Sequence, residues 1–350
     1  MRGIIIGMLL GLVAFSPASA GELAERFSAA AGDGVNVSYF ILDDAGGTAD
    51  QAGDKLYQST PVRIASVTKT FVAATALRLV EEGKLDISKP INHYIDAQYD
   101  DLLTSDGYDT STITVRHLLS HTGGLVDHTH GKPFFETLLS DPSHHWTREE
   151  QIKGAVDWLD PLGAPGEKFS YSDTGYVLLG HIIEKQTGLT LAAAVRRYLA
   201  LDSLGLKNTY WELVEENPDA EARRAHQYFQ GMDTHDWSAT LDHYGGGGLV
   251  STTQDMATFF AALFGGKVFK DKGTLDLMLS HDGLPTDSPY RLGIFEYEVD
   301  GVTFYEHSGF WGTLVMYVPA EKRAIAGAVL HQKHFKAMRE AMVGVITAGK

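Results

Sequence analysis

A serine and a lysine stand three residues apart at the start of an apolar stretch. Ser66 and Lys69 open the segment SVTKTFVAATALRLV, in which apolar residues recur at helical spacing as far as Val80. Because residues three apart share one face of a helix, we expect the two side chains to be neighbours. A lysine beside an apolar core needs a partner or a lowered pKa, and either condition suits it to take or steer a serine proton.

The same pair also has a purely structural explanation. Ser66 could cap the helix that it begins, while Lys69 extends its ammonium along the surface to water. The pattern S-x-x-K is short and occurs often by chance. The pair alone therefore leaves both interpretations open, and the decision depends on what the rest of the chain provides.

Two further segments carry residues that suit acyl transfer. Residues 171–173 are Tyr-Ser-Asp within APGEKFSYSDTGYVLLG, and residues 307–309 are His-Ser-Gly within YEHSGFWGT. Together with S-V-T-K at 66–69, they resemble, in order, the three motifs of the penicillin-recognising serine hydrolases. That family includes class C β-lactamases, DD-peptidases, and related esterases and D-amino-acid peptidases. The stretch TVRHLLSHTGGL is similar to the segment that ends the family's helix before the active-site cleft, so the resemblance covers nearly all of residues 21–350.

The resemblance implies a role for each motif residue. Ser66 would be the nucleophile, and Lys69 and Tyr171 would share the general-base and proton-relay work. His307 would be a second cation that lowers the pKa of Tyr171, and it would orient the leaving group. Gly309 would leave space for a substrate backbone to approach. Taken singly, Tyr171 could equally be a core ring, His307 a solvent-facing strand residue and Gly309 a bulge.

The oxyanion hole and the substrate contacts follow by the same analogy. The backbone N–H groups of Ser66 and Phe310 would face the charge that develops on the attacked carbonyl, with Ser308 beside them. Asp173 departs from the family, which usually carries Asn there. An ionised Asp can only accept hydrogen bonds, so facing Lys69 it would favour the ammonium and shift the base role to Tyr171. Alternatively, Asp173 only caps the helix that follows it.

Histidine-rich segments suggest a metal enzyme as a rival. Asp127-His128-Thr129-His130 and the His144-His145 pair could supply ligands. However, the D-H of the metallo-β-lactamase pattern does not follow H-x-H, and H-E-x-x-H is absent. We therefore expect a polar loop near the cleft, no metal and no cofactor. His121-Thr122-Gly123 also spells the third motif, but it precedes Tyr171 and follows a helix, so a helix stop is expected.

The motifs together predict a serine hydrolase that forms an acyl-enzyme at Ser66. A D-Ala-D-Ala carboxypeptidase or D-amino-acid peptidase is preferred, and histidine in the third motif favours a peptidase or an esterase over an efficient β-lactamase. A class C-like β-lactamase and a short-chain acyl esterase are alternatives, and a non-hydrolytic penicillin-binding sensor is an alternative of another class. G-x-S-x-G is absent around Ser66 and Ser308, so an α/β-hydrolase has no support.

Composition and the first residues indicate where the protein acts. The chain of 350 residues has no cysteine, a formal net charge of -16 and no cluster of Lys and Arg, which argues against nucleic acid and favours a small-molecule or peptide substrate. Residues 1–20 read as a signal peptide cleaved after Ala20. Their apolar run, residues 4–15, is shorter than the roughly 20 residues that span a bilayer. We expect an exported protein, periplasmic or extracellular, with no membrane span after cleavage; the oligomeric state stays open.

The periodicity predicts which elements position these residues. We expect an α/β (α+β) fold in which an antiparallel sheet from both chain ends is flanked by helices, with a mostly helical lobe inserted. Residues 21–350 would form one β-lactamase-related catalytic domain, with a sheet lobe at about 21–65 and 245–350 and a helical lobe at about 66–244. The expected helices are 22–31, a largely helical 66–206 with starts at 114 and 173, 252–265 and 335–348; the expected strands are 35–42, 290–299, 302–307, 313–318 and 324–330.

Overall fold

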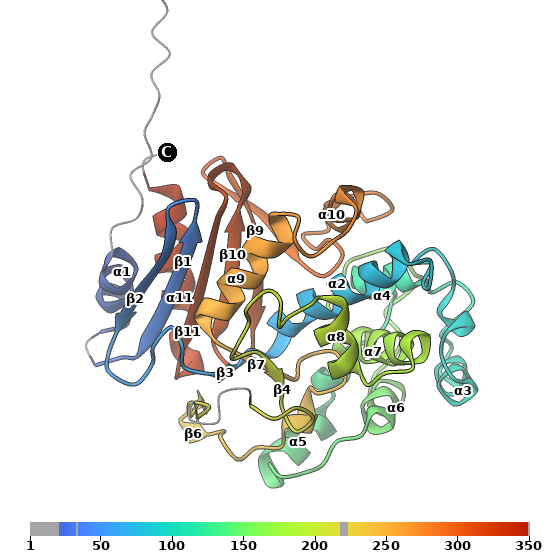
Figure 1. The fold of residues 1–350 in the computed structure, drawn as a ribbon. Coiled ribbons are helices and arrows are strands. Elements are labelled where there is room, and N and C mark those ends of the chain that lie inside the picture. The colour runs from blue at the N-terminus through green and yellow to red at the C-terminus, as the bar shows by residue number, and fades with distance from the viewer. Residues whose placement is uncertain (1–20, 33, 218–222, 349–350) are drawn as a thin grey trace, which may run out of the picture.

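The computed structural model describes residues 21–32, 34–217 and 223–348 (Figure 1). The expected signal peptide lies outside these residues. The helices are α1 (Glu22–Ala31), α2 (Thr68–Glu81), α3 (Ala97–Ser105), α4 (Val115–Leu119), α5 (Lys132–Ser140), α6 (Arg148–Trp158), α7 (Asp173–Thr187), α8 (Leu191–Tyr198), α9 (Thr253–Phe264), α10 (Lys272–Leu279) and α11 (Phe335–Thr347). The strands are β1 (Val37–Asp43), β2 (Gly46–Ala52), β3 (Val62–Arg63), β4 (Tyr210–Trp211), β5 (Tyr228–Phe229), β6 (Met232–Asp233), β7 (Leu249–Ser251), β8 (Phe295–Val299), β9 (Val302–Gly309), β10 (Thr313–Val318) and β11 (Arg323–Val329).

A six-stranded sheet joins the two ends of the chain. Its order is β2-β1-β11-β10-β9-β8 and every neighbouring pair is antiparallel. Strand β1 lies against β11, with Val37 opposite Val329, and the blue and red strands are side by side in Figure 1. The predicted fold class is confirmed. Strand β2 was not predicted, because GGTADQA has a single β-branched residue, Thr48, and no aromatic residue to mark a strand.

Helices cover both faces of this sheet. Helices α1 and α11 pack together on one face, where Leu23, Phe27 and Met342 are fully buried against the strands. Helix α9 packs on β1, β10 and β11 from the other face, and α2 lies beside the green helices α7 and α8 (Figure 1). The division into a sheet lobe and a helical lobe at the residue limits given above stays a prediction.

No helix in the described part of the chain is long and apolar enough to cross a bilayer.

Helix α2 runs through the centre of the molecule. Its residues from Thr68 to Leu79 are all buried, because apolar and small side chains cover nearly its whole circumference and leave little polar face. Phe71 stacks on Phe259 of α9 with ring centroids 3.7 Å apart. The large core around α2 therefore fixes the position of its first turn, which contains Lys69 and directly follows the turn that carries Ser66.

A small sheet holds the segment that leads into α2. Strand β3 pairs with β7, which pairs with β4 on its other side. Ile64 follows β3 directly, and its N–H donates to the carbonyl of Leu249 at 3.1 Å. The backbone just before Ser66 is therefore anchored to strands from later in the chain.

Side-chain caps set the starts of the predicted helices. Thr114 and His117 form a reciprocal capping box at α4. The Thr252 hydroxyl accepts from the N–H of Asp255 at 3.0 Å, at the start of α9. The Asp255 side chain does not complete a reciprocal capping box there, because its carboxylate accepts from the N–H of Asn208 at 2.8 Å.

Removing the Phe71 ring is expected to destabilise the protein strongly. Phe71 is fully buried and stacked, so Phe71→Ala leaves a cavity and costs about 3–5 kcal/mol of unfolding free energy. Urea denaturation followed by circular dichroism measures this loss. Phe135→Ala, at a ring that is 38% exposed, is the matched control and should cost much less; equal losses would contradict a core organised around α2.

Candidate active site

Ser66 lies in a short 3-10 turn, Ala65–Val67, that precedes α2. Its side chain is half-buried and makes no capping hydrogen bond, so the helix-cap explanation is wrong. Ala65 has a φ of 45°, in the left-handed region that a residue with a Cβ adopts only at a cost. The turn thus holds the serine hydroxyl at the start of a buried helix.

The Lys69 ammonium is fully buried beside that hydroxyl. Its Nζ donates to Ser66 Oγ at 2.9 Å and to the carbonyl of Gly246 at 2.6 Å, and it forms an ion pair with Asp173. Because Lys69 is 0% exposed, the alternative of a lysine that reaches water is wrong. Gly246 had no sequence signal, since only its backbone oxygen takes part.

Tyr171 and Asp173 reach the same place from the start of α7. The Tyr171 ring centroid lies 5.0 Å from Lys69 Nζ, and the Asp173 carboxylate pairs with the same ammonium. Ser172 caps α7, because its hydroxyl accepts from the N–H of Gly175 at 3.3 Å. Of the two expectations for Asp173, the structure thus shows the contact with Lys69, while the capping role belongs to its neighbour.

The ion pair determines the charges of the site. Burial by itself lowers the pKa of Lys69, but the Asp173 carboxylate and the Tyr171 phenol raise it above its ordinary value. Burial disfavours the charged carboxylate, yet the Lys69 ammonium holds the pKa of Asp173 below its ordinary value. At neutral pH the pair is therefore an ammonium facing a carboxylate, and the ammonium donates to the serine oxygen.

The expected lowering of the Tyr171 pKa is wrong for this arrangement. Burial raises the pKa of Tyr171 to about 12, against the pull of the Lys69 ammonium, and Asp173 raises it further. His307 does not act as the second cation, because burial and the Lys69 ammonium lower its pKa to about 3. The phenol is therefore neutral, beside one cation and one anion.

His307 is fixed as a neutral ring on β9. Its Nδ1 lies 3.0 Å from the carbonyl of Ser308, and its Nε2 lies 2.9 Å from the hydroxyl of Tyr290. Since a carbonyl can only accept, Nδ1 carries the proton and the Tyr290 hydroxyl donates to Nε2. The ring is buried, so it is not the solvent-facing residue that the alternative described, and its centroid is 6.4 Å from that of Tyr171.

The end of β9 packs against the backbone that precedes Ser66. A Cβ on Gly309 would lie 2.1 Å from the carbonyl oxygen of Ile64. The glycine therefore makes room for this backbone, whereas from the sequence it was expected to make room for a substrate. Ser308 is half-buried opposite Leu314 of β10. Phe310 follows with its side chain 39% exposed, and its ring lies 5.0 Å from that of Phe229.

His121 is a neighbour of the site that sequence reasoning missed. It ends the turn after α4 with a φ of 56°, which agrees with the expected helix stop. Its ring also lies 4.1 Å from Tyr171 and 4.7 Å from Tyr290, and its Nδ1 accepts from the N–H of Ser172 at 3.1 Å. The positive φ could have been suspected at H-T-G-G, but the contact with Tyr171 joins distant segments and had no local signal.

The histidine-rich segment 127–130, expected from the sequence to be a polar loop, is more buried than such a loop would be. His128 is 1% exposed, and its backbone N–H and Nδ1 each lie 3.0 Å from the hydroxyl of Thr174 on α7. The Asp127 carboxylate accepts from the N–H and the hydroxyl of Thr129. In residues 21–32, 34–217 and 223–348, no group of three or more His, Asp or Glu side chains is placed to hold a metal ion.

The contacts define what this arrangement can do chemically. The structure brings Ser66, Lys69, Tyr171 and Asp173 into one cluster, with His307 behind the phenol and the end of β9 beside the serine backbone. A half-buried hydroxyl thus faces two proton-carrying groups, which suits nucleophilic attack coupled to proton transfer.

Comparisons with known proteins identify the family of this chain. The family model described as Beta-lactamase matches residues 29–343. Esterase EstB of Burkholderia gladioli is 33% identical over 171 residues, which are 47% of this chain and only 42% of that protein. A Salmonella enteritidis protein named "Putative D-alanyl-D-alanine carboxypeptidase" is 27% identical over 340 residues, covering 83% of this chain and 76% of the relative.

A solved structure extends the match to almost the whole chain. The D-stereospecific amidohydrolase from a Streptomyces species superposes with a TM-score of 0.80 at 25% identity, covering 91% of this chain and 97% of that one. The family model spans most of the chain, and the serine, lysine and tyrosine lie together inside the matched range. The chain belongs to the β-lactamase family of serine hydrolases.

Proposed function

We propose that this protein is an exported amide hydrolase for D-amino-acid substrates, of the D-Ala-D-Ala carboxypeptidase or D-amino-acid peptidase type, with Ser66 as its nucleophile. The observation that carries the proposal is the buried Lys69 ammonium, whose Nζ lies 2.9 Å from Ser66 Oγ with Tyr171 beside it. Such a cluster has no structural need for a serine, because Asp173 and Gly246 already provide Lys69 with partners.

The reaction proceeds through an ester on Ser66. Its Oγ attacks the carbonyl carbon of the scissile amide, and its proton passes to the base formed by Tyr171 and Lys69. The developing oxyanion accepts from the backbone N–H groups of Ser66 and Phe310. The C–N bond then breaks as the leaving amine takes the proton. Water attacks the ester in the same way and releases the acid.

The protonation of the resting site makes base formation depend on pH. Lys69 is held as an ammonium, and the pKa of Tyr171 is raised to about 12 by burial. Either group must lose its proton before it can take one from Ser66. Acylation is therefore expected to accelerate as the pH rises above neutrality.

Two lines of support favour D-amino-acid amides. The relatives matched over most of this chain carry the names of a D-alanyl-D-alanine carboxypeptidase and a D-stereospecific amidohydrolase. In addition, histidine stands in the third motif where lysine is usual in β-lactamases, which favours a peptidase or an esterase over an efficient β-lactamase. A β-lactamase and a penicillin-binding sensor use the same apparatus and are outcomes of the substrate test below.

A short-chain esterase is the second candidate, and His307 favours it. Its Nδ1 proton is held by the Ser308 carbonyl, and its Nε2 accepts from Tyr290, so the ring has no free proton for a leaving amine. A phenolate or alkoxide leaves with less protonation than an amine does. Esterase EstB, although matched over less than half of its length, carries the corresponding name.

Export is proposed from the sequence of residues 1–20. Expressed with its native first residues in a Gram-negative host, the protein is expected in the periplasmic fraction, with a mature N-terminus at Gly21. Mass spectrometry of the fractionated protein measures this, and a variant with Leu9→Arg and Leu10→Arg in the apolar run is the control that should stay in the cytoplasm uncleaved. An uncleaved cytoplasmic wild type would contradict export.

A substrate panel tests the proposed activity. The kcat/KM values of D-Ala-D-Ala peptides, D-amino-acid amides, cephalosporins and p-nitrophenyl esters are compared, and the D-amino-acid amides or peptides are expected to be highest. Ser66→Ala should abolish turnover and covalent labelling by a fluorophosphonate. Ser38→Ala, at a buried serine on β1 that bonds Thr253, is the control and should keep both. Labelling of Ser66→Ala would refute the nucleophile, and a burst without turnover would favour the sensor.

Replacing Asp173 is expected to shift the pH dependence to lower pH. The carboxylate raises the pKa of both Lys69 and Tyr171, so Asp173→Asn lowers both pKa values. The pH profile therefore shifts in the same direction whichever of the two groups is the base. The alkaline rise of kcat/KM should move down by about 1–3 pH units. Asp255→Asn, at a buried carboxylate that bonds Asn208 and Thr209, should leave the profile in place. An unmoved profile in Asp173→Asn would exclude both groups as the base.

A further inference from the structure

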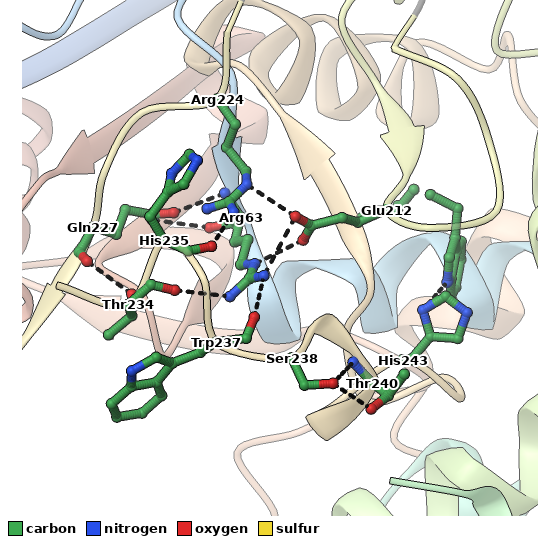
Figure 2. Close-up of polar contacts among 12 residues, drawn as sticks. Arg63, Glu212, Arg224, Gln227, Thr234, His235, Trp237, Ser238, Thr240 and His243 are labelled. Atoms are coloured by element: carbon green, nitrogen blue, oxygen red, sulfur yellow. Dashed lines mark hydrogen bonds and ion pairs between the residues drawn. The ribbon is translucent and has the colours of Figure 1, made fainter. Parts of the chain in front are cut away.

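The side-chain amide of Gln227 connects two backbone segments that flank the serine. Its Oε1 accepts from the N–H of Arg63 at 2.8 Å, and its Nε2 donates to the carbonyl of Arg63 at 3.1 Å and to the carbonyl of Trp311 at 3.0 Å. Figure 2 shows the amide facing the Arg63 backbone. Gln227 is buried, so water does not compete for these hydrogen bonds and does not weaken them.

The two connected segments carry the proposed oxyanion donors. Arg63 lies three residues before Ser66, and Trp311 directly follows Phe310. A second side chain makes a parallel connection, because the Thr313 hydroxyl donates to the carbonyl of Ile64 at 3.0 Å. The separation of the two donor segments is therefore held by two buried side chains.

The orientation of the amide is fully determined by its partners. One backbone N–H needs an acceptor and two carbonyls need donors, which a glutamine supplies and a glutamate cannot. The Gln227 backbone is itself held, since its carbonyl accepts from the N–H and the hydroxyl of Thr234 at 3.0 and 2.7 Å. The amide is thus a rigid spacer.

A buried ion-pair network fastens the segment that carries this glutamine. The Arg63 guanidinium pairs with Glu212 at 2.7 Å and donates to the carbonyls of Thr234 and Trp237 at 3.2 and 2.7 Å. Arg224 pairs with the same carboxylate at 2.9 Å. Figure 2 shows Glu212 between the two arginines. The segment from Arg224 to Trp237 is therefore clamped onto β3, the strand that leads to the nucleophile.

We propose that Gln227 is a positioning residue that sets the spacing of the two oxyanion donors. It touches neither substrate nor the reacting atoms and acts through the backbones of residues 63–66 and 310–311. The inference rests on the proposed function, in which those N–H groups stabilise the tetrahedral intermediate. Loss of the amide lets the two segments drift apart, which weakens binding of the transition state more than binding of the substrate.

The test separates positioning from stability. Gln227→Ala and Gln227→Glu are measured with the best substrate of the panel and with phenylboronic acid, which forms a tetrahedral adduct with a reactive serine. For both variants kcat is expected to fall about 10- to 100-fold, with KM changed less than about 3-fold. The inhibition constant of the boronic acid should rise by a factor similar to the fall in kcat/KM.

The chain offers a matched control for lost stability. Gln151 is also buried, and its Nε2 donates to the carbonyls of Thr240 and Leu241 at 3.1 and 2.9 Å. Gln151→Ala removes a comparable pair of bonds away from the two donor segments and should lower the melting temperature with kcat nearly unchanged. If the Gln227 variants do not fold, Thr313→Val replaces them, with Thr75→Val as its control, because Thr75 bonds only within α2.

The outcomes distinguish the two proposals. If wild-type protein fails to react with a fluorophosphonate and with every panel substrate, the proposed function and the positioning role both fall. If the wild type reacts, but the Gln227 and Thr313 variants match their controls in kcat and in boronic acid affinity, only the positioning role is refuted. A selective loss of kcat and of boronic acid affinity supports it.

Discussion

The ion pair between Lys69 and Asp173 is the interaction on which the rest of the site depends. An ammonium buried among α2, α7 and the Gly246 backbone would be costly without a counter-ion, because desolvation costs several kcal/mol per charge. Asp173 is the first residue of α7, where the helix dipole also favours a negative charge. The requirement for the pair therefore fixes how the two helices meet, and with them the serine and the tyrosine.

The same pair gives this chain a resting state that differs from the one the motifs suggest. An asparagine at position 173 would leave only Tyr171 to oppose the burial that lowers the pKa of Lys69. The aspartate instead keeps the proton on Lys69 and adds to the burial that keeps the phenol of Tyr171 neutral. In the proposed mechanism, acylation therefore begins with the loss of a proton from Lys69 or Tyr171. The neutral His307 is consistent with this, since its partners are a hydroxyl and a carbonyl.

The sequence predicted the elements better than the contacts between them. Strand β9, the start of α7 and the terminal helices follow from the periodicity of the sequence, which is local. Strand β2 was missed because most of its residues have low strand propensity; it is held by pairing with β1 and by packing against α1, where the N–H of Ala24 donates to the Asp50 carboxylate at 3.1 Å. The Lys69 and Asp173 pairing was anticipated as one option. His121, Tyr290 and Gln227 were missed because their roles depend on contacts across distant segments, which no spacing reveals.

The sheet that joins the two chain ends has a consequence for biosynthesis. Strand β1 has β11 as its inner neighbour, and Leu42 faces Ala324 across that ladder. While a ribosome is still making the chain, β1 has no inner partner, and contacts of such long range form slowly. A translocase that accepts only unfolded polypeptide would therefore meet the nascent protein before its central ladder had closed.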